Sequence, residues 1–136
     1  MKNLWPKIKI EDSSVPAKLM VEQGKHLEKI TDGILTYDLH TVMDHSDDTP
    51  SKTIIRSQFY IHAPLINNYK FMLLYFQHDF LSSYPVSTFY FTEDETELHV
   101  AKDEKEFEKI LGNLLGKTST QRVISTLYTR SQPQLV

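Results

Sequence analysis

The chain has 136 residues, of which 40% are hydrophobic and 24% are charged, and this composition excludes a largely disordered or low-complexity protein. It contains no cysteine, which excludes a disulfide scaffold, a thiolate zinc site and a cysteine nucleophile. The formal net charge of -3 argues against nucleic-acid binding, and the length accommodates one domain, which we expect to span residues 1–136.

The sequence shows no signal for secretion or for a membrane span. Residues 1–14 lack the apolar stretch of a secretory signal peptide. The longest unbroken apolar run, Phe71 to Phe76, is far shorter than the roughly 20 residues that cross a bilayer. We therefore expect a soluble, cytoplasmic protein that does not associate with membranes.

The N-terminal part is expected to contain an arm and a helix. Residues 1–13 are expected to form a mobile arm, with a short edge strand as the alternative. The helix is expected to begin near Ser13 or Ser14, because a hydroxyl there can accept a hydrogen bond from a free backbone N–H, and Pro16 suits the first turn. Gly24 either weakens this helix or marks a point of close packing.

Beyond Gly33, which we expect to end the helix, apolar residues recur at every second position, as is typical of strands. Five strands are predicted, at residues 34–44, 55–62, 69–78, 86–92 and 97–101. Short turns join them, including one at Glu93-Asp94-Glu95, and no crossover helix intervenes. Strands joined in this way pair as an antiparallel meander.

The C-terminal part is predicted to be helical again. Asp103 and Glu106 have the spacing of a capping box, an apolar stripe follows, and Gly116 is expected to end this helix. A last amphipathic helix follows, and residues 131–136 are expected to fray. The sequence therefore predicts a single α+β domain of order α-β-β-β-β-β-α-α, with the helices packed on one face of the sheet.

If the turn at residues 64–68 forms a simple hairpin, it determines which side chains share a face of the sheet. The predicted register pairs Phe59 with Leu73, Ile61 with Phe71, Tyr60 with Met72, Gln58 with Leu74, Arg56 with Phe76, Asp38 with Tyr60 and His40 with Gln58. The helix-covered face would then carry Leu35, Tyr37, Leu39, Phe59, Ile61, Phe71, Leu73, Val86, Leu98 and Val100. The opposite face would carry the candidate binding residues Met72, Leu74, Phe76, Phe89, Phe91, Tyr60, Arg56, Gln58, His40 and Asp38.

An apolar patch with a polar rim is typical of an interaction surface. The sequence therefore predicts a small non-enzymatic interaction module that binds a protein partner or a second copy of itself, giving a homodimer. One alternative is that the N-terminal arm or a helix covers this face. Another is a small-molecule-binding or enzymatic pocket between the sheet and the helices, using Arg56, Tyr60 and His40. A third is an immunity- or chaperone-like protein with a specific partner, since similar arrangements recur in such proteins and in cystatin-like folds.

No motif in the sequence indicates catalysis or cofactor binding. Residues 111–118 approximate a phosphate-binding loop, but they lie between two predicted helices and do not follow a strand. Asp44, Ser46 and Asp48 resemble the start of a calcium loop whose glycine and bidentate glutamate are missing. None of the 6 histidines has the spacing of a metal motif. We expect no catalytic residue, no metal and no cofactor.

Overall fold

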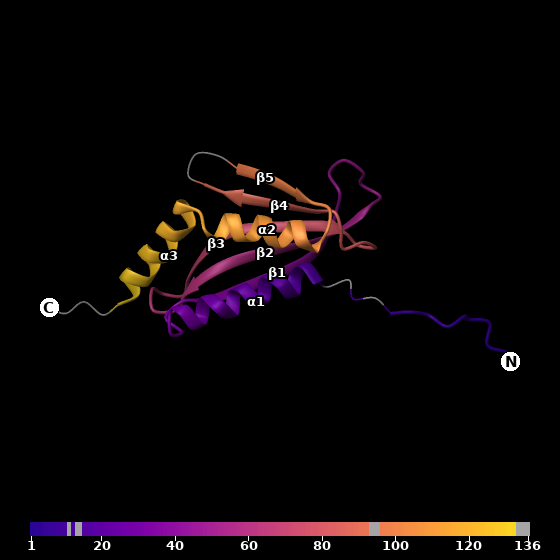
Figure 1. Ribbon diagram of the computed structural model, residues 1–136, viewed down its shortest axis with the longest axis horizontal. Coiled ribbons are helices and arrows are strands. Elements are labelled where there is room, and N and C mark those ends of the chain that lie inside the picture. The colour runs from indigo at the N-terminus through magenta and orange to yellow at the C-terminus, as the bar shows by residue number, and fades with distance from the viewer. Residues whose placement is uncertain (11, 13–14, 93–95, 133–136) are drawn as a thin grey trace.

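A five-stranded antiparallel sheet with three helices forms the protein, in a computed structural model that describes residues 1–10, 12, 15–92 and 96–132 (Figure 1). The elements are α1 (Val15–Ile30), β1 (Thr36–His45), β2 (Thr53–Ala63), β3 (Tyr69–Asp79), β4 (Val86–Phe91), β5 (Thr96–Ala101), α2 (Glu104–Leu115) and α3 (Thr118–Ser131). The strands lie in the order β1-β2-β3-β4-β5. The predicted α+β meander is confirmed.

Helix α1 begins and ends where local chemistry favours it. Pro16 lies in the first turn, where its missing N–H costs no hydrogen bond. The predicted cap at Ser13 or Ser14 lies outside the described residues. The helix ends before Gly33, whose positive φ of 78° lets its N–H donate to the carbonyl of Glu28.

The hairpin between β2 and β3 follows the predicted turn. β2 ends at Ala63 because Pro64 has no N–H to donate to the ladder. Asn67 and Asn68 turn the chain with φ values of 50° and 55°, which asparagine tolerates better than most residues. The predicted turn at residues 93–95 lies outside the described part of the chain.

Side-chain hydrogen bonds lie at the start of α2 and at the end of α3. The Asp103 carboxylate accepts a hydrogen bond from the backbone N–H of Glu106, which caps α2. Helix α3 extends through Ser131, which is buried and donates its hydroxyl proton to the carbonyl of Leu127. The expectation that the chain frays from residue 131 is therefore wrong for Ser131, and residues 133–136 are not described.

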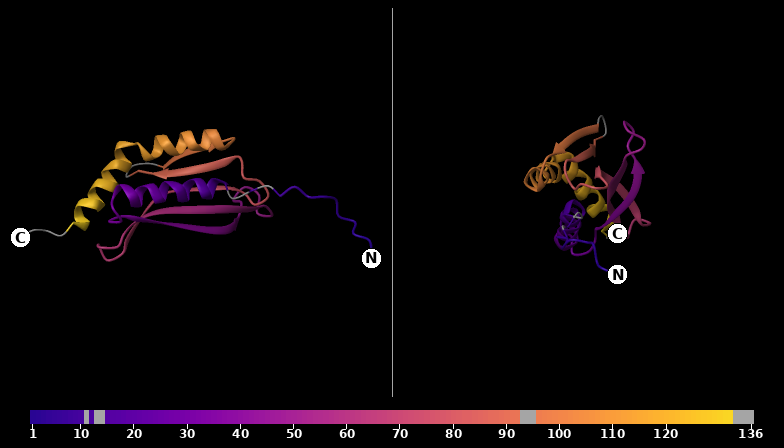
Figure 2. Two further views of the ribbon diagram at one scale, coloured as in Figure 1. Left: turned by 60° about the horizontal axis from the view of Figure 1, so that its bottom comes forward. Right: turned by 90° about the vertical axis from the view of Figure 1, so that its right-hand side faces the viewer.

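The core lies between one face of the sheet and the helices (Figure 2). Its fully buried side chains come from both layers and include Met20, Leu35, Ile61, Leu73, Leu74, Phe76, Tyr90, Phe107 and Leu114. Residues 1–10 extend away from the domain and are all exposed (Figure 1). Neither this arm nor a helix covers the other face of the sheet, so that alternative is wrong for the described chain.

Candidate functional site

The sheet face that points away from the helices, here called the open face, is the candidate site. Along β2, buried Ser57, Phe59 and Ile61 alternate with partly exposed neighbours, which is the pattern of a strand with one covered face. Most of the sequence-predicted binding residues lie on the open face: Asp38, His40, Arg56, Gln58, Tyr60, Met72, Phe89 and Phe91.

Leu74 and Phe76 are the exceptions, and their predicted placement is wrong. Both are fully buried in the core. Between β2 and β3, the pairs Ile61–Phe71 and Tyr60–Met72 are as predicted. A β-bulge then leaves Leu73 as an extra residue on β3, so that Leu74 pairs with Phe59. A one-residue shift exchanges the faces of all later side chains on the strand.

The same shift brings an aromatic residue to the open face that the sequence did not indicate. Tyr75, between Leu74 and Phe76, stacks on Phe89 with ring centroids 4.6 Å apart. It also contacts Phe91, with centroids 5.6 Å apart. No sequence signal could place Tyr75 here, because the run around it is apolar on both faces.

The faces of β5 are the reverse of those predicted. Leu98 pairs with Phe89 and Val100 pairs with Ser87, so both point to the open face. They are 56% and 53% exposed, and they do not belong to the core. Together with Met72, Tyr75, Phe89 and Phe91 they form the apolar half of the open face.

The polar half of the open face, on β1 and β2, is held by ion pairs and hydrogen bonds. The Lys70 ammonium lies 2.7 Å from the Asp38 carboxylate, and its hydrogen bond holds the pKa of Asp38 below the usual value. Arg56 donates to Asp44 at 2.9 Å and to Gln77 at 3.2 Å. The pKa of Asp44 is lowered, first by the backbone N–H of His45 and then by Arg56.

Arg56 joins the two halves of the open face. Its guanidinium carbon lies 5.5 Å from the centroid of the Tyr75 ring, in cation–π geometry. Its side chain is only 22% exposed. The apolar half therefore has a polar border whose charges are neutralised within the chain.

The alternative pocket between the sheet and the helices does not contain the residues proposed for it. Arg56 and Tyr60 lie on the face opposite the helices, and His40 is exposed on the same face. The structure therefore does not bring these three residues into a cavity under the helices, and the predicted pocket built from them is wrong.

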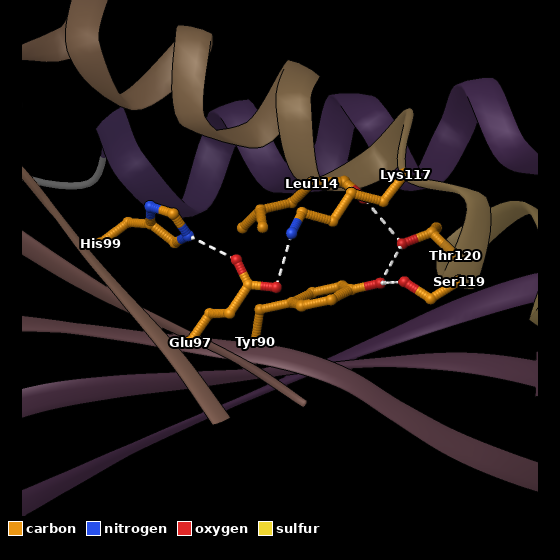
Figure 3. Close-up of polar contacts among 7 residues, drawn as sticks. All are labelled: Tyr90, Glu97, His99, Leu114, Lys117, Ser119 and Thr120. Atoms are coloured by element: carbon orange, nitrogen blue, oxygen red, sulfur yellow. Dashed lines mark hydrogen bonds and ion pairs between the residues drawn. The ribbon is translucent and has the colours of Figure 1, made fainter. Parts of the chain in front are cut away.

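A separate polar cluster lies on the helix side of the sheet, between β4, β5 and the connection of α2 to α3 (Figure 3). The Glu97 carboxylate accepts from Lys117 at 2.5 Å and lies 3.2 Å from the His99 ring nitrogen. Lys117 also lies 5.6 Å from the centroid of the Tyr90 ring. These contacts connect the outermost strand to the start of α3.

We expect the Glu97→Gln variant to lose less stability than the wild-type chain when the pH is lowered. The Lys117 hydrogen bond lowers the pKa of Glu97 in the folded state, so its contribution is present above the unfolded pKa and is lost as the pH falls through the folded pKa. At pH 7 the variant should be less stable by about 0.5 kcal/mol, as for other partly exposed pairs, and at pH 3 the difference should vanish.

Urea unfolding at both pH values measures this difference. Glu22→Gln, at an exposed position of α1, is the matched control and should unfold like the wild-type chain at both. If the free energy of unfolding of Glu97→Gln were below that of the wild-type chain by the same amount at pH 7 and pH 3, the ion pair would be contradicted.

The described residues contain no group of three or more His, Asp or Glu side chains placed to hold a metal ion. In that same part of the chain, no helix is long and apolar enough to cross a membrane. Comparison with protein-family models, curated proteins and solved structures found no match to this chain. The open face and the cavities of the fold are therefore the features of the molecule that bear on its function.

Proposed function

We propose that this chain is a small non-enzymatic protein-interaction module that binds through the apolar half of its open face, and that its first partner is a second copy of itself. The observation that supports the proposal most directly is the exposure of Leu98 and Val100, at 56% and 53%, beside the stacked rings of Tyr75 and Phe89. A contiguous apolar patch of this kind, enriched in aromatic residues, is typical of interaction surfaces.

The two edges of the sheet differ in a way that favours contact at β5. On the open face, edge strand β1 carries Asp38, His40 and Asp44, and charged groups on an edge discourage pairing with another chain. The other edge strand, β5, presents Leu98 and Val100 on that face. Its charged Glu97 points to the helix side, where Lys117 neutralises it.

A second copy meets this patch with the same residues if the two chains are related by a two-fold axis. Such an isologous contact would bury Leu98, Val100 and the aromatic rings of both copies. The ion pairs Asp38–Lys70 and Arg56–Asp44 would form a polar rim that is already satisfied without the partner.

Sedimentation velocity over a range of protein concentrations tests this proposal. We expect the wild-type chain to dimerise, and Leu98→Glu to raise the dissociation constant by about tenfold or more, because it buries two carboxylates at the centre of the contact. Leu81→Glu is the matched control, since Leu81 is 92% exposed in the connection between β3 and β4, outside the open face.

A wild-type chain that stays monomeric at every concentration would overturn self-association. Equal effects of Leu98→Glu and Leu81→Glu would overturn the assignment of the surface. With a monomer, the immunity- or chaperone-like alternative predicts that one specific protein binds the wild-type chain and Leu81→Glu but does not bind Leu98→Glu.

A further inference from the structure

A cavity of about 500 Å³ lies between β3, β4 and α3, away from the exposed side chains of β5. Its volume lies in the range of small-molecule sites. The wall is mainly apolar and aromatic and includes Phe71, Met72, Leu73, Tyr90, Phe91 and Val123. The space is therefore suited to the apolar part of a ligand.

The cavity exists because β3 and β4 pair along only part of their length. Their ladder joins residues 74–77 to residues 87–90, and residues 71–73 of β3 have no partner on β4. The bulge at Leu73 lies where the pairing stops. The two strands diverge toward the end of the sheet where α3 lies (Figure 1), and α3 contributes the remaining wall.

One wall is fixed by a chain of hydroxyl groups (Figure 3). Thr120 donates its single hydroxyl proton to the carbonyl of Leu114 at 2.7 Å, so it must accept the proton of Tyr90, whose oxygen lies 2.7 Å away. The Tyr90 oxygen then accepts from Ser119 at 2.5 Å. The hydroxyl protons of Tyr90 and Ser119 are thus already used, and neither is free to bind a ligand.

Arg122 is the side chain at this cavity that can recognise a charge. Among the described residues that line the cavity it alone is charged. It is exposed, and within the described part of the chain it makes no ion pair or hydrogen bond. It lies in the second turn of α3.

We propose that this cavity binds a small amphipathic anion, namely an aliphatic carboxylate. The alkyl chain would occupy the apolar space between β3, β4 and α3, and the carboxylate would accept a bidentate pair of hydrogen bonds from Arg122. A cation would meet the guanidinium with the same sign of charge, and a neutral ligand would leave Arg122 without a partner among the described residues. Met72 and Phe91 border both this cavity and the open face, but Leu98, Val100, Tyr75 and Phe89 do not line the cavity. The proposal therefore does not depend on dimerisation.

Isothermal titration calorimetry with decanoate tests the site. We expect Arg122→Gln to weaken decanoate binding by about tenfold or more, since the charge-assisted bidentate pair is lost while a polar side chain is kept at this position. Arg130→Gln, at an exposed position of the same helix outside the cavity, is the matched control and should bind like the wild-type chain. Decanamide should bind the wild-type chain about tenfold more weakly than decanoate does and should not distinguish it from Arg122→Gln.

Methyl NMR spectra place the ligand in the molecule. Decanoate should shift the methyl signals of Leu73 and Val123 in the wild-type chain and equally in Leu98→Glu. In the wild-type chain it should leave the methyl signals of Leu98 and Val100 unchanged. No binding of decanoate, equal binding of decanoate and decanamide, equal effects of the two arginine variants, or shifts confined to Leu98 and Val100 would each overturn the proposal.

Discussion

Phe76→Ala should lower the free energy of unfolding by about 3–5 kcal/mol, because it removes a large buried ring and leaves a cavity. Phe76 is fully buried, and its ring meets Phe107 of α2 edge-on with centroids 5.3 Å apart. Phe89→Ala, on the open face of the neighbouring strand, removes the same number of atoms from a partly exposed position. We expect it to cost less than half as much.

Urea unfolding at low protein concentration, where a dimer would be dissociated, measures both variants. For self-association we expect the reverse order, with the larger effect from Phe89→Ala. This variant should weaken the dimer, because the Phe89 ring stacks on Tyr75 within the proposed surface. Equal losses of stability in the two variants would contradict the placement of Phe76 in the core and of Phe89 on the open face.

Much of the fold follows from local patterns in the sequence. Pro64 ends β2, the two asparagines after it turn the chain, and the alternating side chains of the first two strands give their pairing. Asp38 pairs with Tyr60 and His40 with Gln58, as predicted. These features are predictable because each depends on residues close together in the chain or on a clear two-residue period.

The bulge in β3 could not be predicted in the same way. Residues 71–76 are apolar on both faces, so the pattern carries no signal of which residue is the extra one. Leu73 and Leu74 are both buried although they are consecutive, which is possible only where the alternation is interrupted. The extra residue, Leu73, places Leu74 and Phe76 on the helix-covered face and Tyr75 on the open face.

The reversal of β5 has a long-range cause. The sequence pattern predicts that Leu98 and Val100 lie on the helix-covered face. In the structure Lys117, from the connection between α2 and α3, neutralises Glu97 on the helix side. That ion pair joins residues far apart in the sequence, and the cavity beside Arg122 likewise depends on where the β3–β4 ladder stops, so neither can be read from local spacing.

Gly24→Ala should lower the free energy of unfolding by about 1–3 kcal/mol through overpacking, although alanine is the better helix former by about 1 kcal/mol. A Cβ at position 24 would lie 2.3 to 2.6 Å from ring atoms of Tyr37. That ring cannot move away easily, because it stacks on Phe59 of the next strand with centroids 6.0 Å apart. Of the two roles that the sequence left open for Gly24, the structure supports close packing of α1 on β1.

Gly112→Ala provides the matched control. Gly112 is exposed in α2 and has no atom within 4 Å of an added Cβ, so the same substitution should raise stability by about 0.5–1 kcal/mol. Urea unfolding of both variants measures whether each substitution lowers or raises the free energy of unfolding. Adding Tyr37→Ala should remove the penalty at position 24, because the clashing ring is then absent and the two substitutions are coupled by contact. A stabilising Gly24→Ala, or a penalty that persists without the Tyr37 ring, would show that α1 does not pack on β1 at this distance.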